Sequence, residues 1–173
     1  MEKKYVSKKD VKRIASDELQ KGRTKTEILA ELTDVYYEKD LLAKFIAGTP
    51  HPETKNKLKL VNILLAIISI VIVAFRFLVF GIDYIGSGLT ILTLIMGISI
   101  FTFEATSYRL LSIVCIMTFV RYFMNYGISQ YLLVDLGLTL VIAVLGFYLG
   151  SKLFPNYGIL AVKKDSHGAP ILE

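Results

Sequence analysis

The chain has 173 residues, 54% of them hydrophobic, and its 20 Lys and Arg against 15 Asp and Glu give a net charge of +5 at pH 7. So much apolar sequence in long runs is unusual for a soluble domain, and it leaves no room for a soluble catalytic domain of usual size. The positive charge borders the apolar runs, which favours contact with lipid head groups over binding to nucleic acid.

Residues 1–57 are polar and charged and predict a cytoplasmic head of three short helices and a linker. Residues 7–10 and residues 24–27 each resemble a capping box, in which a Ser or Thr and an acidic residue close a helix start. Apolar residues then recur at helical spacing. This core is near the lower size limit for independent folding, so we expect it to depend on the membrane part or on a partner. The head is predicted to bind a cytoplasmic protein or its own copies. The candidate contact residues are Ile28, Leu29, Leu32, Leu41, Leu42 and Phe45.

The segment KGRTKTEILAELTD at residues 21–34, followed by LLAKFI at residues 41–46, resembles bacterial HAAS-type helical domains. Residues 33–37 read TDVYY where that family usually has Leu-Gly-Asp-Pro. HAAS-type domains precede several membrane spans in small proteins linked to sensing and regulation. The resemblance therefore implies a helical head with a regulatory role, and it supplies no catalytic residues.

Four apolar stretches follow and predict an all-α membrane unit at residues 58–154, with spans at about 58–80, 84–104, 108–126 and 130–151. About 20 residues of helix cross a hydrocarbon core of about 30 Å. Because the intervening loops are short, adjacent spans must be antiparallel neighbours in an up-down four-helix bundle. Aromatic residues near the span ends, including Tyr108 and Tyr122, are interpreted as belts at the two membrane surfaces.

Basic residues border the first and last spans and predict that both termini are cytoplasmic, in a bacterial cytoplasmic membrane. Four of them are expected to contact anionic lipids: Lys55, Lys57, Lys59 and Lys152. The cytoplasmic tail at residues 155–173 contains a strand-like stretch at 159–162 and turn residues at 165–168, a pattern that indicates a possible β-hairpin. Because an isolated hairpin is marginal, the tail either packs on the head or is disordered.

Charged residues near the outer ends of the spans form a candidate intramembrane cluster: Arg76, Asp83, Arg121 and Asp135. Arg121 and Asp135 flank the turn between the third and fourth spans and are the expected ion pair, which Arg76 and Asp83 can join. The cluster can form a polar cavity for an anion, a lipid head group or a proton. We favour a pair that fixes the register of the helices, because buried charges must be neutralised.

Gly146 and Gly150 form a GxxxG pattern in the fourth span. Small residues four apart let two helix backbones approach closely, either within the bundle or between two copies of the chain.

No sequence pattern points to a catalytic, cofactor or metal site, and an enzyme is not expected. The favoured function is regulation, sensing or scaffolding. One alternative is a small oligomeric transporter or channel that uses the charged cluster, and a second is a protein that binds or modifies lipid. A dry, closed bundle would favour the role in regulation, sensing or scaffolding over both alternatives.

Overall fold

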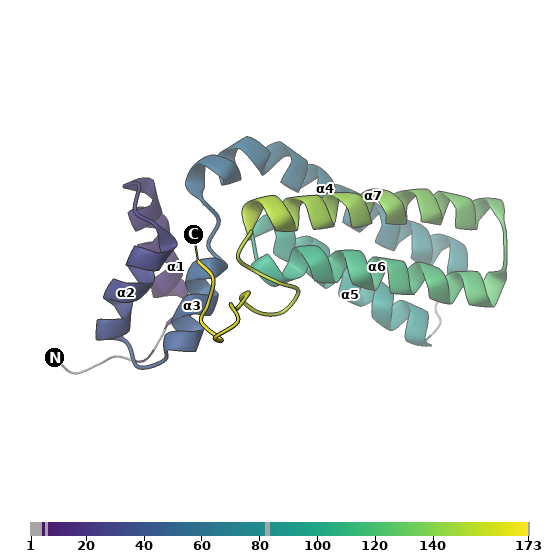
Figure 1. The fold of residues 1–173 in the computed structure, drawn as a ribbon. Helices are drawn as coiled ribbons and strands as arrows, with labels where there is room; N and C mark the ends of the chain where they lie inside the picture. Colours follow the sequence, from purple (N-terminus) through teal and green to yellow (C-terminus); the bar gives the residue numbers. More distant parts are fainter. Residues whose placement is uncertain (1–4, 6, 82–83, 173) are drawn as a thin grey trace. The chain divides into compact units, whose positions relative to one another are not determined.

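The computed structural model describes residue 5 and residues 7–81 and 84–172, without the side chains of residues 84 and 85. This described part contains seven α-helices and no β-strand (Figure 1). The helices are α1 (Lys8–Gln20), α2 (Lys25–Val35), α3 (Lys39–Ala47), α4 (Pro52–Phe80), α5 (Tyr84–Phe101), α6 (Ala105–Tyr126) and α7 (Gln130–Leu153).

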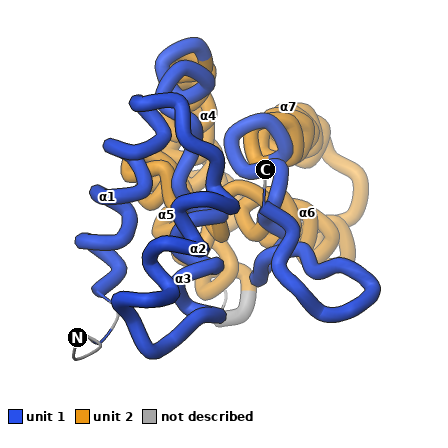
Figure 2. The backbone as a smooth tube through the Cα atoms, turned by 60° about the vertical axis from the view of Figure 1, so that its left-hand side comes forward, with its two compact units in different colours: residues 1–57, 151–173 blue, residues 58–150 orange. Residues whose placement is uncertain are grey.

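The chain divides into two compact units (Figure 2). Residues 1–57 and 151–173 form the head–tail unit, and residues 58–150 form the bundle. The tail therefore belongs to the same compact unit as the head, although the whole bundle lies between them in sequence.

The head core forms where α1, α2 and α3 turn their apolar sides toward one another. Val11, Leu42 and Ile46 are fully buried in it, and neighbouring core side chains are at most 8% exposed. Gly22, with φ of 84°, makes the turn between α1 and α2, a conformation that other residues rarely adopt. The head therefore uses its apolar residues to hold its own three helices together.

The two expected capping boxes have different outcomes. At α2 both bonds are present: Glu27 N donates to Thr24 Oγ1 at 3.3 Å, and Thr24 N donates to Glu27 Oε2 at 2.9 Å. At α1 the prediction is wrong, because Ser7 stands at the N-cap but its side chain makes no capping hydrogen bond. The first turn of α1 is exposed, so water can satisfy its backbone N–H groups.

The tail turns back on itself through two isolated antiparallel bridges, Tyr157–Val162 and Lys164–Pro170, without forming a described strand. The carboxylate of Asp165 closes the turn by accepting the N–H groups of His167 and Ala169. Pro170 has no N–H, which limits the ladder that a hairpin needs. The expected hairpin is thus present only as single bridges.

The end of the tail packs on the head. Leu172 contacts the head core, and its carbonyl oxygen accepts a 2.8 Å hydrogen bond from Thr26 Oγ1. Lys164 Nζ lies 3.7 Å from a carboxylate oxygen of Asp40 in α3. Of the two expected states of the tail, the structure has the packed one.

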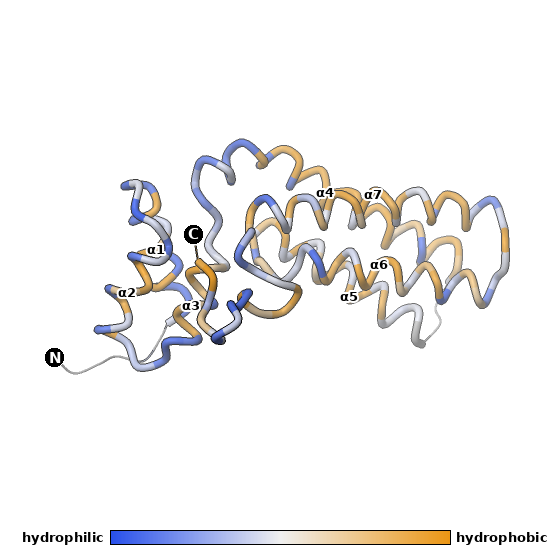
Figure 3. Tube along the Cα trace, in the orientation of Figure 1, coloured by the Kyte–Doolittle hydropathy of each residue, from blue (hydrophilic) through white to orange (hydrophobic). Residues whose placement is uncertain are grey.

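Helices α4 to α7 carry most of the apolar sequence (Figure 3). Helices α4, α6 and α7 are long and apolar enough to cross a membrane, and α5 supplies a shorter apolar helix over Gly86–Phe101. Large apolar side chains point outward, with Leu60 81%, Leu78 86% and Val144 66% exposed. Such a surface is stable in lipid and not in water, as in an integral membrane protein.

Close helix contacts in the bundle depend on glycine. A Cβ atom on Gly146 would lie 2.8 Å from the carbonyl oxygen of Tyr108 in α6, and one on Gly150 would lie 3.2 Å from Tyr108 Cβ. Gly97 of α5 approaches Ser69 of α4 in the same way. The GxxxG pattern of α7 therefore faces α6 inside the bundle.

Candidate functional site

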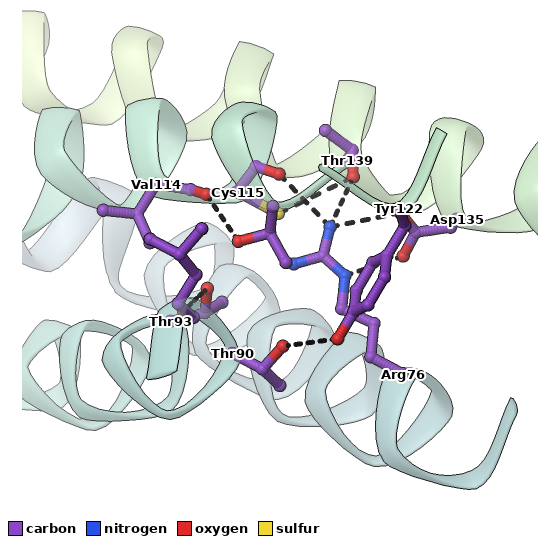
Figure 4. A network of polar contacts seen from close by, with 10 residues as sticks. Arg76, Thr90, Thr93, Val114, Cys115, Tyr122, Asp135 and Thr139 are labelled. Atoms are coloured by element: carbon purple, nitrogen blue, oxygen red, sulfur yellow. Dashed lines mark hydrogen bonds and ion pairs between the residues drawn. The ribbon is translucent and has the colours of Figure 1, made fainter. Parts of the chain in front are cut away.

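A buried ion pair joins Arg76 of α4 to Asp135 of α7 (Figure 4). Arg76 Nε donates to Asp135 Oδ1 at 2.8 Å, and Arg76 Nη2 donates to Asp135 Oδ2 at 3.2 Å. Both side chains are 0% exposed. This two-point geometry is the strongest form of the Arg–carboxylate interaction, and it neutralises two charges that would be costly alone in an apolar bundle.

The same guanidinium group also binds α6. Nη2 of Arg76 lies 3.2 Å from the carbonyl oxygen of Cys115 and 3.0 Å from Thr139 Oγ1. Thr139 in turn contacts the Cys115 thiol, with 3.7 Å between Oγ1 and Sγ. One arginine therefore connects three helices, each through a buried polar atom.

Tyr122 of α6 extends this network to α5. Its ring centroid lies 5.8 Å from Arg76 Cζ, within range of a cation–π interaction. Its hydroxyl group is 3.1 Å from Thr90 Oγ1 in α5, and its ring stacks on Phe80 with 4.5 Å between centroids. All four bundle helices thus contribute to one polar network (Figure 4).

One hydrogen-bond donor of this network has no acceptor in the described part of the chain. Nη1 of Arg76 is buried and has no hydrogen-bond partner among the described residues. A buried donor without a partner is costly, so a small acceptor bound at this atom would remove that cost.

The structure gives the members of the predicted charged cluster different roles. Both carboxylate oxygens of Asp135 are bound by Arg76, which was expected only as an additional member, whereas Arg121 was expected as the main partner. Arg121 is half-buried on α6, and Asp83 lies outside the described residues. The turn between α6 and α7 places Arg121 and Asp135 at similar depth, but it does not decide the direction in which their side chains point. Arg76 of α4 is fully buried and lies against Asp135.

A second buried polar cluster was not predicted. Tyr108 donates from its hydroxyl group to Asn62 Oδ1 at 2.5 Å, and Asn62 Nδ2 donates to the carbonyl oxygen of Ile100 at 3.0 Å. Tyr108 is 0% exposed, so it is a core residue and not part of an aromatic belt, and Tyr122 at 1% exposure is another. The sequence feature that could have indicated this cluster is Asn62, a single polar amide within the first apolar stretch.

The predicted contact residues of the head are mostly occupied within the head itself. Ile28, Leu29, Leu32 and Leu42 belong to its buried core, and Phe45 packs against that core. Only Leu41 is exposed, at 39%. Because α1 to α3 bury the same apolar sides that were assigned to a partner, this set does not form a free surface.

Among the described residues, no group of three or more His, Cys, Asp or Glu side chains is placed to hold a metal ion. No family model matches the chain, and neither a curated protein nor a solved structure is similar enough to match it.

Proposed function

We propose that this is a small membrane protein with a regulatory or scaffold role, in which a bundle anchors a cytoplasmic head that binds a partner protein or a second copy. The observation that carries the proposal is the Arg76–Asp135 pair, because both side chains are fully buried and bound to each other. A buried pair whose members bind each other fits a role in holding the helices in register.

The packing of the tail supports a bundle that crosses the membrane four times. The start of α4 and the end of α7 belong to one compact unit, which supports their emergence on the same side of the membrane. Helices α4, α6 and α7 alone would give an odd number of crossings. Helix α5 has 18 residues, about 27 Å of helix, which is close to the hydrocarbon thickness of about 30 Å. This parity supports α5 as the additional span.

The distribution of basic residues supports a cytoplasmic head and tail. Lys55, Lys57 and Lys59 lie at the start of α4, and Lys152 lies in the last turn of α7. An excess of Lys near the ends of spans is typical of the cytoplasmic side of a membrane, and we propose that this membrane is a bacterial cytoplasmic one.

The best-placed contact surface of the head lies around the turn between α2 and α3. Tyr37 is 60% exposed and Leu41 39%, and the ring of Tyr37 lies 6.1 Å from that of Tyr5. Exposed aromatic side chains such as Tyr37 are typical of protein contacts. This surface replaces the buried set as the proposed site of partner binding.

Photocrosslinking tests the proposed contact surface. A photoreactive residue at position 37 or 41 of the full chain in membranes should give one discrete crosslinked product. The same residue at exposed position 9 of α1 is the matched control and should give none. A product of doubled mass from the purified protein identifies a second copy, and a product seen only in membranes identifies another protein. Equal products from positions 9 and 37, or none from 37 and 41, would contradict the proposal.

A transporter or channel is the second candidate, and Nη1 of Arg76 is the observation that favours it. A buried guanidinium donor of this kind suits a carrier of anions, because it stays positively charged. Ion flux in liposomes that is lost on Asp135→Asn, with unchanged thermal stability, would favour this candidate over the first.

A further inference from the structure

A pocket of about 350 Å³ lies within the head–tail unit. Its walls come from the turn before α2, the first turn of α4, the last turn of α7 and the start of the tail. Every lining residue belongs to residues 1–57 or 151–173, so the pocket is a feature of this one unit.

The lining of the pocket is basic. Arg23, Lys25, Lys152 and His51 line it, and none of its described lining residues is Asp or Glu. Glu18 and Glu31 bind Arg23 at 2.9 and 2.6 Å and hold it in place, and Lys25 is 5% exposed and donates to the carbonyl oxygen of Ala47 at 3.3 Å. Lys152 is exposed at the end of α7. Because Glu18 and Glu31 offset the charge of Arg23, the net positive charge of the pocket comes from Lys25 and Lys152. A concave surface with this charge attracts an anion such as a phosphate group.

Asn156 indicates that the ligand of this pocket also donates a hydrogen bond. It lines the same pocket and is only 2% exposed, and its Oδ1 atom has no hydrogen-bond partner among the described residues. A buried amide oxygen in this state favours a ligand that donates a hydrogen bond. The pocket therefore fits a phosphate that carries a hydroxyl or ammonium group.

The pocket lies at the ends of two candidate membrane spans, which indicates that its phosphate belongs to a lipid. Thr54 lies in the first turn of α4 and Lys152 in the last turn of α7, and both helices are candidate membrane spans. Residues at the ends of spans lie among lipid head groups. We propose that the pocket binds the phosphate head group of an anionic phospholipid, with Lys152 as the main charge contact and Asn156 as the acceptor for a head-group hydroxyl. The proposal depends on α4 and α7 crossing the membrane and not on a partner protein.

The test uses the full chain purified in a neutral detergent. Phosphatidylglycerol is titrated in, phosphatidylcholine serves as the neutral lipid, and binding is measured by native mass spectrometry. Lys152→Gln should weaken the binding of phosphatidylglycerol about fivefold, the usual effect of one basic residue near anionic lipid. Lys163→Gln removes the same charge from an exposed tail position outside the pocket and should leave binding unchanged.

Asn156→Asp is the second variant, because it keeps the shape of the side chain and places a negative charge in the pocket. It should weaken phosphatidylglycerol more than Lys152→Gln does, and a circular dichroism melt verifies that both variants are folded. Equal weakening by Lys163→Gln and Lys152→Gln would overturn the proposal, because attraction would then be a property of the whole surface. Competition by soluble glycerol 3-phosphate at the concentration of the lipid would also overturn it, since the site would then take a free phosphate ester.

Discussion

Arg76 and Asp135 lie 59 positions apart in the chain, yet both oxygens of the Asp135 carboxylate are bound by the Arg76 guanidinium group inside the bundle. This contact joins the first and last helices of the bundle, and Cys115 and Thr139 add two further acceptors. The pair can therefore fix how α4, α6 and α7 slide and rotate against one another.

Removal of one charge of this pair should cost more than removal of both. Asp135→Asn leaves Arg76 charged and unpaired in an apolar bundle, so we expect a loss of about 3 kcal/mol or more in the free energy of unfolding. Arg76→Gln in the same chain should restore part of that loss. Unfolding in detergent, followed by circular dichroism at the helix band, measures the double-mutant cycle.

Arg121→Gln is the matched control for this cycle, because it removes a guanidinium group from the neighbouring helix. It should not rescue Asp135→Asn. Strictly additive losses for Arg76 and Asp135, or rescue by Arg121→Gln as large as that by Arg76→Gln, would remove the pair from the account.

A methyl group at Gly146 should separate α6 from α7. The new Cβ atom would meet Ser112 and lie 2.8 Å from the carbonyl oxygen of Tyr108, so Gly146→Ala should lower the melting temperature. Gly137→Ala, in the same helix with no atom within 4 Å of the new Cβ, should leave stability unchanged or raise it by up to about 1 kcal/mol. Equal effects of the two substitutions would show that this contact does not limit the packing.

The two N-caps of the head should respond differently to the loss of a hydroxyl group. Thr24→Ala removes the hydroxyl oxygen that accepts the Glu27 N–H group, keeps the bond from its own backbone N–H to Glu27 Oε2, and should cost about 1 kcal/mol. Ser7→Ala should cost much less, because Ser7 makes no side-chain cap bond. Hydrogen exchange of α1 and α2 amides in the full chain measures each helix separately, and a larger effect of Ser7→Ala would refute the assignment.

Acid should destabilise the head. The N–H group of Thr24 and then its hydroxyl group hold the pKa of Glu27 below its ordinary value of 4.5, and hydrogen bonds from Lys21 and then Arg23 do the same for the pKa of Glu18. Because folding lowers these pKa values, the stabilisation is present above about pH 4.5 and is lost as the pH falls through the folded values. Protection of α2 amides, corrected for intrinsic exchange, should therefore fall below about pH 4.5. Glu27→Gln should flatten this dependence, and unchanged protection down to about pH 3 would contradict it.

Features with a strong local cause could be predicted from the sequence. The capping box at Thr24 depends on two residues three positions apart, and the apolar character of α4, α6 and α7 is a property of each helix alone. Their positions could therefore be read without knowing what each helix packs against.

Features that depend on the direction of a side chain could not be predicted in this way. Arg76 and Arg121 both lie about one turn from a helix end, and only the rotation of α4 and α6 decides which one meets Asp135. Leu42 and Leu41 are adjacent and equally apolar, yet one is 0% and the other 39% exposed. Helical spacing predicts that an apolar face is buried, but it does not tell whether the face packs within the chain or against a partner.

The most direct test of the account is which side of the membrane each loop occupies. Single cysteines at positions 81, 102, 127 and 163, in a chain with Cys115→Ala, are labelled with a membrane-impermeant maleimide in intact cells. A four-span bundle with a cytoplasmic head and tail predicts labelling at 81 and 127, and at 102 and 163 only after the membrane is opened. Labelling of 163 in intact cells, or labelling of 81 and 102 from the same side, would contradict the central claim that α5 completes a bundle anchoring a cytoplasmic head.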